Sequence, residues 1–231
     1  MMRIIKPWAA ALLLTVSSAG VVAADGEAIL KAQCNSCHNL EGPAPATLHE
    51  LWQRQAPDLF YAGNKYQAAW LERWLQQPTT IRPAGMFYVD HIKAGSAGDQ
   101  IDASTMRPHS ALSAADAKAV AAALMERKAR SDLVVAGSYV PGTISRSSGE
   151  MMFDKFKGCL ACHEIEPGYG GLSGPEVYTV AQRLQADYLV SFLSRPQAWD
   201  PKIFMPDKHL SDGDVQKFVH YLRLLSVEAR Q

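Results

Sequence analysis

The sequence lacks a long hydrophobic run and an excess of charge of either sign. Its 231 residues include only four cysteines. No apolar stretch reaches the roughly 18 residues that a membrane-spanning helix needs, which excludes a polytopic membrane protein. Lys and Arg together number 23, and so do Asp and Glu. Because proteins that bind nucleic acid usually carry a basic excess or stripe, this balance argues against nucleic acid as a partner.

The N-terminus has the layout of a secretory signal peptide. Arg3 and Lys6 form a short positive region, an apolar core covers residues 8–16, and small residues precede Asp25. The core is short for a membrane anchor, which is the alternative interpretation. We therefore expect cleavage near Ala24, a periplasmic location, and no stable membrane span in the mature chain.

The four cysteines lie in two clusters with the pattern C-x-x-C-H, the attachment signature of c-type haem. The clusters consist of Cys34, Cys37 and His38, and of Cys159, Cys162 and His163. Two thiols on one helical turn bond to the two vinyl groups of the porphyrin, and the adjacent imidazole ligates the iron. A disulfide, a thioredoxin-like redox pair and a zinc site are the alternatives. The histidines are unexplained in a redox pair, and the 125 residues between the clusters do not fit zinc-ribbon spacing. The sequence predicts two covalently attached haem c groups.

The chain contains an internal repeat. Residues 57–78 align without a gap with residues 175–196, at a shift of 118. Within them, apolar residues recur at i, i+1, i+4 and i+5, which is typical of one face of a helix. These residues are Trp70, Leu71, Trp74 and Leu75 in the first copy and Tyr188, Leu189, Phe192 and Leu193 in the second. We interpret them as core residues that also cover a haem edge.

Further helices are predicted around these segments. Ser113 with Asp116, and Ser211 with Asp214, resemble capping boxes that open helices ending near Arg127 and Leu225. Helices also precede each cysteine cluster, around residues 27–33 and 150–157. The resulting organisation is a signal peptide at 1–24, a first domain at 25–133, a linker at 134–148 and a second domain at 149–231.

This order of helix, C-x-x-C-H, loop, helix, methionine loop and helix resembles a class I cytochrome c domain, present twice. The resemblance implies an all-α fold of two class I cytochrome c domains in tandem, each wrapped around one covalently bound haem. In that family a loop proline carbonyl accepts the proximal histidine N–H, which fixes the ring. By resemblance, this role falls to Pro57 for His38 and to Pro175 for His163.

The second axial ligands are predicted from methionines that precede the last helix of each half. Met205 is expected to bind the second iron, because a thioether in this slot favours the ferrous state. In the first half, Pro78 to Met106 spans 28 residues where Pro196 to Met205 spans nine. Counting from the following helix favours Met106. The alternatives are Met86, His91, His109 and an open site.

The extra residues of the first half, about 87–105, form an insertion that contains Gly and Asp. They are interpreted as a solvated surface loop, with a docking or gating element over the first haem as the alternative.

The function expected from these features is that of a periplasmic dihaem c-type cytochrome. It would carry single electrons from a dehydrogenase or quinol-oxidising complex to a terminal oxidase or reductase, possibly as a subunit of such an enzyme. The expected partners are then redox proteins. We expect an electron-transfer protein rather than an enzyme. The alternatives are a dihaem enzyme, thiosulfate dehydrogenase-like or peroxidase-like, with catalysis at the first haem, and a haem-based sensor. No cysteine remains as an axial ligand, which counts against the usual thiosulfate catalyst.

Overall fold

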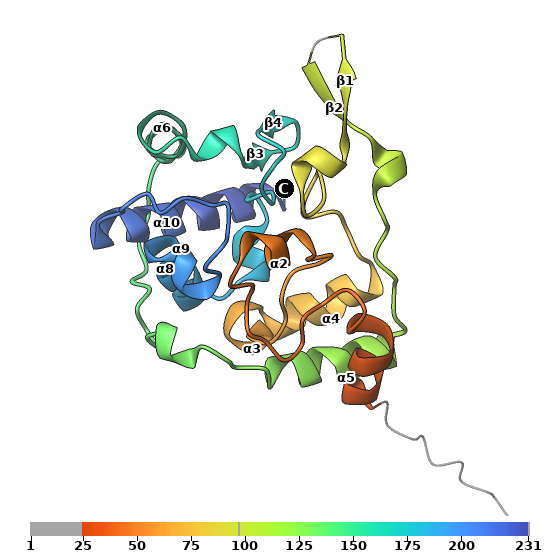
Figure 1. Cartoon of the computed structure of the whole chain (residues 1–231). Helices are drawn as coiled ribbons and strands as arrows, with labels where there is room; N and C mark the ends of the chain where they lie inside the picture. The colour runs from red at the N-terminus through yellow and green to blue at the C-terminus, as the bar shows by residue number, and fades with distance from the viewer. Residues whose placement is uncertain (1–24, 97, 231) are drawn as a thin grey trace, which may run out of the picture.

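Helices account for about 47% of the chain, and the remainder consists of loops and two short antiparallel hairpins (Figure 1). The structure is a computed structural model that describes residues 25–96 and 98–230, so the expected signal peptide lies outside the described residues. The expected all-α pair of class I cytochrome c domains is wrong. Two such domains would need about 200 mostly helical residues, and no group of metal-binding side chains is seen in the described chain. The physical reason is that long stretches rich in glycine, proline and polar residues lack helical periodicity.

The elements of the first half begin close to the expected mature N-terminus. In chain order they are α1 (Gly26–Ile29), η1 (Leu30–Cys34), α2 (Leu48–Trp52), α3 (Ala62–Lys65), α4 (Ala68–Gln76), η2 (Tyr88–Asp90), β1 (Ile92–Gly95), β2 (Gly98–Ile101), η3 (Ala103–Thr105), α5 (Ala114–Met125) and η4 (Ser131–Leu133).

The second half follows an irregular segment, residues 134–145. Its elements are α6 (Arg146–Met151), η5 (Met152–Phe156), η6 (Cys159–Ala161), β3 (Glu164–Glu166), β4 (Tyr169–Gly170), α7 (Val180–Arg183), α8 (Ala186–Ser194), α9 (Pro196–Trp199) and α10 (Asp212–Glu228).

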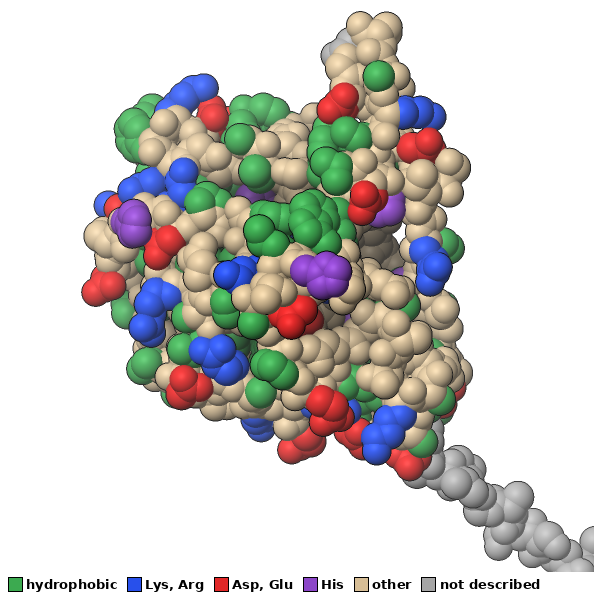
Figure 2. All heavy atoms as spheres, viewed as in Figure 1, with side chains coloured by type: hydrophobic (Ala, Val, Ile, Leu, Met, Phe, Trp, Pro, Cys, Tyr) green, Lys and Arg blue, Asp and Glu red, His purple; other side chains and the backbone are tan. Residues whose placement is uncertain are grey.

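The two hairpins occupy different places in the two halves. Strands β1 and β2 lie inside the predicted insertion, pair from Ile92↔Ile101 to Gly95↔Gly98, and project away from the rest of the molecule (Figures 1 and 2). Strands β3 and β4 instead follow the second cysteine cluster directly. The expected surface loop is therefore partly a hairpin, with mostly exposed side chains.

The helix predicted in each copy of the repeat is confirmed. These helices are α4 and α8, which begin and end at positions 118 residues apart. The shorter helices α3 and α7, which were not predicted, show the same shift. The predicted N-caps are also present, because the Ser113 and Ser211 side chains each accept a hydrogen bond from the backbone N–H three residues later, at 3.2 Å.

The repeated segments meet each other in a reciprocal contact. Tyr66 and Leu184 form an antiparallel bridge, and the backbone N–H of Gln67 donates to Arg183 O at 2.8 Å. The Gln185 N–H donates to Lys65 O at 2.9 Å, which is the same contact with the two halves exchanged. The side chains of both glutamines donate to carbonyls of the opposite half. The halves are therefore joined by an approximately symmetric seam.

In each half, a glycine lets the N-terminal helix approach the C-terminal one. A Cβ on Gly26 of α1 would lie 2.1 Å from the carbonyl oxygen of Ala119 in α5. A Cβ on Gly149 of α6 would lie 2.1 Å from the ring of Tyr221 in α10. Only glycine allows these distances without movement of the neighbour. None of the described helices is long and apolar enough to cross a membrane.

Candidate functional site

Both C-x-x-C-H clusters border one cavity of about 840 Å³ between the halves. Five of the six motif residues that would bind haem line it: Cys34, Cys37, His38, Cys159 and His163. Cys162 is exposed and is not among the lining residues. The volume lies in the upper part of the range typical of pockets for small molecules and cofactors. The fold therefore brings together two motifs that are far apart in the sequence.

The two clusters have the same local backbone. The Cys37 N–H donates to Cys34 O at 3.1 Å, and the His38 N–H donates to the same oxygen at 2.9 Å. In the second cluster the corresponding bonds to Cys159 O are 3.1 and 3.2 Å. A π-helical turn leads to this turn in both halves. In the first half η1 ends at Cys34 itself, and in the second half η5 ends at Phe156, shortly before Cys159. The result is that both thiols and the imidazole of each cluster share one compact turn.

All four cysteines are free thiols. The disulfide alternative is thus absent from the described chain. The same residues contain no group of three or more His, Cys, Asp or Glu side chains that could hold a metal ion by themselves. This finding leaves no structural zinc site of the usual four-ligand kind among them.

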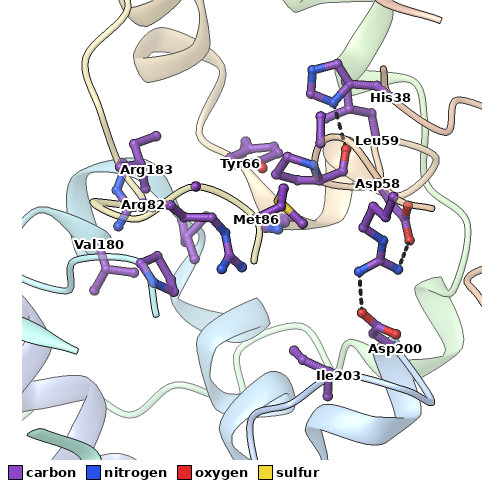
Figure 3. Close-up of a pocket in the computed structure, with 18 of the residues that line it drawn as sticks. His38, Asp58, Leu59, Tyr66, Arg82, Met86, Val180, Arg183, Asp200 and Ile203 are labelled. Atoms are coloured by element: carbon purple, nitrogen blue, oxygen red, sulfur yellow. Dashed lines mark hydrogen bonds and ion pairs between the residues drawn. The ribbon is translucent and has the colours of Figure 1, made fainter. Parts of the chain in front are cut away.

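Both motif histidines make the hydrogen bond that the resemblance implies. The Nδ1 atom of His38 lies 2.7 Å from Pro57 O (Figure 3). That of His163 lies 2.7 Å from Pro175 O. A carbonyl oxygen only accepts, so Nδ1 carries the proton and Nε2 keeps its lone pair. This tautomer and orientation are those of a metal-binding imidazole whose other nitrogen is held by the protein.

The environment keeps these imidazoles neutral. Burial lowers the pKa of His38, and the nearby His109 and Lys65 add to the effect, while the bond to Pro57 opposes it. Burial also lowers the pKa of His163, with Arg82 and Arg183 adding to it against the bond to Pro175. The neutral form is the one that donates a lone pair to a metal.

Buried charges line the wall between the two clusters. Arg54 bridges Asp58 and Asp200 at 2.9 and 2.6 Å, which joins the two halves by an ion pair (Figure 3). Arg183 pairs with the buried Glu176 at 3.0 Å. Burial raises the pKa of Asp58, and Arg54 opposes that rise. These charges are paired, as buried charges generally are.

Two further cations of the cavity have no such partner. Among the described residues, neither Lys65 nor Arg82 forms an ion pair with a carboxylate. The Lys65 ammonium instead lies over three tyrosine rings, at 5.0 to 5.9 Å from their centres. Burial lowers the pKa of Arg82, and the cations Arg54 and Arg183 add to that effect. The cavity therefore carries two cations that form no ion pair with a carboxylate among the described residues.

Arg82 occupies a central position. It lies between the His38 and Met86 side of the cavity and the Val180 and Arg183 side (Figure 3). Its segment reaches the second half through a backbone bond in which the Glu176 N–H donates to Ile81 O at 2.8 Å. The residues just before the predicted insertion thus connect the two motifs.

This charged wall was not predicted, although the sequence carries a signal for part of it. Lys65 and Arg183 occupy the same position of the repeat, 118 residues apart. A cation in both copies of an otherwise apolar segment indicates a shared requirement for positive charge.

The candidate axial ligands also border the cavity. Its lining includes all three methionines considered for the iron, Met86, Met106 and Met205, together with His91 and His109. His91 bonds through Nδ1 to the Thr105 hydroxyl at 2.8 Å. The imidazole of His109 lies opposite that of His38, with ring centres 6.3 Å apart.

Comparison of the chain with protein-family models, with curated proteins and with solved structures finds no match.

Proposed function

We propose that the protein binds two haem c groups covalently and transfers single electrons between redox proteins. The observation that carries the proposal is the pair of equivalent C-x-x-C-H turns, each with its histidine held by a proline carbonyl, on one shared cavity. A thiol pair and an imidazole on one turn match what a covalently attached, iron-ligated porphyrin requires. The proposal does not depend on the fold class that was expected.

The residues that would hold the two groups are divided between the motifs and the cavity wall. Cys34, Cys37, Cys159 and Cys162 would form the thioether bonds, and His38 and His163 would ligate the irons. Pro57 and Pro175 would orient the two imidazoles, and Met205 is proposed as the second ligand of the second iron.

The charge of the cavity also fits this cofactor. Haem carries two carboxylates, and an anion taken into a low-dielectric site requires positive partners. Lys65 and Arg82 form no ion pair with a carboxylate of the described chain, and Arg82 borders the space between the motifs. We propose that these two side chains bind haem carboxylates.

Haem bound in this way supplies a one-electron iron couple near neutral pH. The protein lowers the pKa values of both imidazoles and would hold the two groups on one shared cavity. The helices α3 and α7 and the seam between them fix the relative positions of the two motifs. The physiological donor and acceptor are proposed to be proteins, because both iron sites would be occupied by side-chain ligands.

The first experiment is to express the full chain with haem-attachment machinery and count haem c per chain by the pyridine haemochrome method. Two haems per chain, together with a mass increase of two haems on the denatured protein, are expected. A purified chain that carries no covalent haem under these conditions contradicts the proposal.

The second experiment separates an electron carrier from an enzyme. The reduced holoprotein is mixed with carbon monoxide, and in parallel with peroxide or, after oxidation, with thiosulfate. A carrier with fully ligated irons binds carbon monoxide slowly and turns over neither substrate. Rapid turnover of either would replace the carrier proposal with the dihaem enzyme alternative.

Export is a separate proposal, based on residues 1–24 alone. N-terminal sequencing of the purified protein is expected to begin at Asp25, and haem-stained protein is expected in the periplasmic fraction. A mature protein that starts at Met1 would contradict it.

A further inference from the structure

A second imidazole lies close to that of the first motif at the cavity. The rings of His38 and His109 have centres 6.3 Å apart and planes inclined at 60°. Both residues line the cavity. His109 follows η3, in the segment that leads to α5, and had been one of several alternatives for the distal position.

The separation of the two rings suits a metal atom between them. Metal–imidazole bonds are about 2 Å long and the ring centre lies roughly 1.1 Å beyond the nitrogen, so two imidazoles on opposite sides of one metal have centres about 6 Å apart. The observed 6.3 Å agrees with that spacing. The 60° inclination of the planes is compatible with it, because two imidazoles that bind one metal need not have parallel planes.

The second imidazole is also prepared for this role by its neighbours. Its Nδ1 atom lies 2.9 Å from Ser110 O, so Nδ1 carries the proton and Nε2 keeps its lone pair, as in His38. The ring of Trp74 in α4 packs against it, with centres 4.7 Å apart. The Leu112 N–H donates to Leu75 O at 2.8 Å, which ties the same segment to α4. Two contacts thus hold the ring, and a backbone bond fixes its segment against α4.

The second half offers no equivalent histidine. The nearest in sequence, His209, is 90% exposed at its side chain and lies 3.5 Å from Asp207. It is not among the residues that line the cavity, whereas Met205 is. The two motifs therefore face different distal side chains.

We propose that His109, rather than Met106, is the second axial ligand of the iron at His38, so that the protein carries one bis-histidine haem and one histidine–methionine haem. The inference rests on the proposed haem binding. Because a thioether ligand raises the reduction potential relative to a second imidazole, the second haem would be the stronger electron acceptor. Electrons would then enter at the first haem and pass to the second.

The test uses the full-length holoprotein and the weak near-infrared absorption of methionine-ligated ferric haem. Its intensity in the wild type is expected to correspond to one methionine ligand for two haems. His109→Ala should make the first haem high-spin and reactive to carbon monoxide, and added imidazole should restore the low-spin spectrum. Met106→Ala and Met86→Ala should leave both spectra unchanged.

Two further variants make the result decisive. His109→Met should add a second methionine band, which a purely structural role would not produce. His91→Ala is the matched control, since His91 also lines the cavity in the same half, and it should change nothing. A wild-type band equal to two methionines, or a spectral change confined to Met106→Ala or Met86→Ala, would overturn the inference.

The haem count distinguishes this inference from the function on which it rests. Two haems per chain with two methionine ligands would refute the role of His109 and leave the proposed function intact. Fewer than two covalent haems in the wild type would refute the proposed function itself.

Discussion

The two halves of the chain share a scaffold and differ in what lies over it. Helices α3 and α4 reappear 118 residues later as α7 and α8 with the same lengths. Between α4 and α5, however, the first half inserts the hairpin β1–β2 and the segment that carries His109. The second half reaches Met205 within a few residues of α9. The side that carries the motif histidines is therefore duplicated, and the segment between the last two helices is specific to each half.

The cation that occurs in both copies of the repeat differs between the halves in the same way. Lys65 and Arg183 occupy one position of the repeat, but Arg183 pairs with Glu176 at 3.0 Å while Lys65 rests on tyrosine rings. The charge is repeated, and its partner is not. A buried ammonium over aromatic faces is stabilised more weakly than one that is ion-paired. It is thus more available to an anion in the cavity.

The largest expected effect comes from removing one motif at a time. The double replacement Cys34→Ala with Cys37→Ala, and the same change at Cys159 and Cys162, should each reduce the covalent haem count from two to one. If the distal sides differ as proposed, loss of the first motif keeps the methionine band and loss of the second abolishes it. The measurements are haem stoichiometry and near-infrared absorption. Identical spectra from the two variants would show that the halves are equivalent after all.

The next effect concerns the glycines between terminal helices. Gly26→Ala forces a methyl group onto the backbone of α5, whereas Gly149→Ala forces one onto the side chain of the buried Tyr221. Overpacking of this kind costs about 1–3 kcal/mol, so we expect both changes to destabilise and Gly26→Ala to do so more. Denaturant unfolding of the holoproteins measures the difference. Gly213→Ala, where a Cβ meets nothing within 4 Å, is the control and should not destabilise.

A smaller effect is expected at Arg82, which lines the cavity between the two motifs. Removing the charge in Arg82→Gln should lower the haem potentials, because a buried cation favours the reduced iron. A loss of about 1–2 kcal/mol of electrostatic stabilisation corresponds to roughly 40–90 mV for one electron. Arg73→Gln removes the same charge from an exposed position of α4 and should shift the potentials much less, since solvent and salt screen it. Redox titration compares the two, and equal shifts would contradict a role for Arg82 inside the cavity.

The features that could be predicted from the sequence are those that repeat or that depend on local spacing. The repeated apolar face located α4 and α8, and serine spacing located the caps at Ser113 and Ser211. These elements are determined by periodicity and local hydrogen bonds, both of which are visible in a single sequence.

The features that escaped prediction depend on distant partners. Strands β1 and β2 have mostly exposed side chains, so they lack the alternation that marks a half-buried strand. The segment before them bonds to the second half through Ile81 and Glu176, which nothing local in either sequence indicates. The choice among distal ligands likewise required the position of His109 relative to His38, which no counting from flanking helices provides.

The smallest expected effect concerns Tyr221. Its ring packs against Gly149 in the second half, whereas Gly26 in the first half packs against Ala119 and Ala123. Its hydroxyl is buried, with no hydrogen-bond partner in the described part of the chain. Because a buried hydroxyl without a partner costs about 1–3 kcal/mol, Tyr221→Phe should stabilise the fold by about 1 kcal/mol. Denaturant unfolding near pH 7 measures this gain, and a loss of stability would show that the hydroxyl has a favourable partner.

The pH dependence of the same variant sharpens this comparison. Burial raises the pKa of Tyr221 to about 12, and the nearby Glu150 and Glu228 add to the rise while Arg146 opposes it. The folded chain keeps the phenol proton to about pH 12, whereas the unfolded chain releases it near pH 10. A raised folded pKa contributes stability that is fully present below pH 10 and is lost as the pH rises from 10 to 12. Tyr221→Phe lacks this loss, so its advantage over the wild type should widen in that interval. An advantage that stays constant between pH 9 and 12 would mean that Tyr221 ionises in the folded protein as readily as in the unfolded chain.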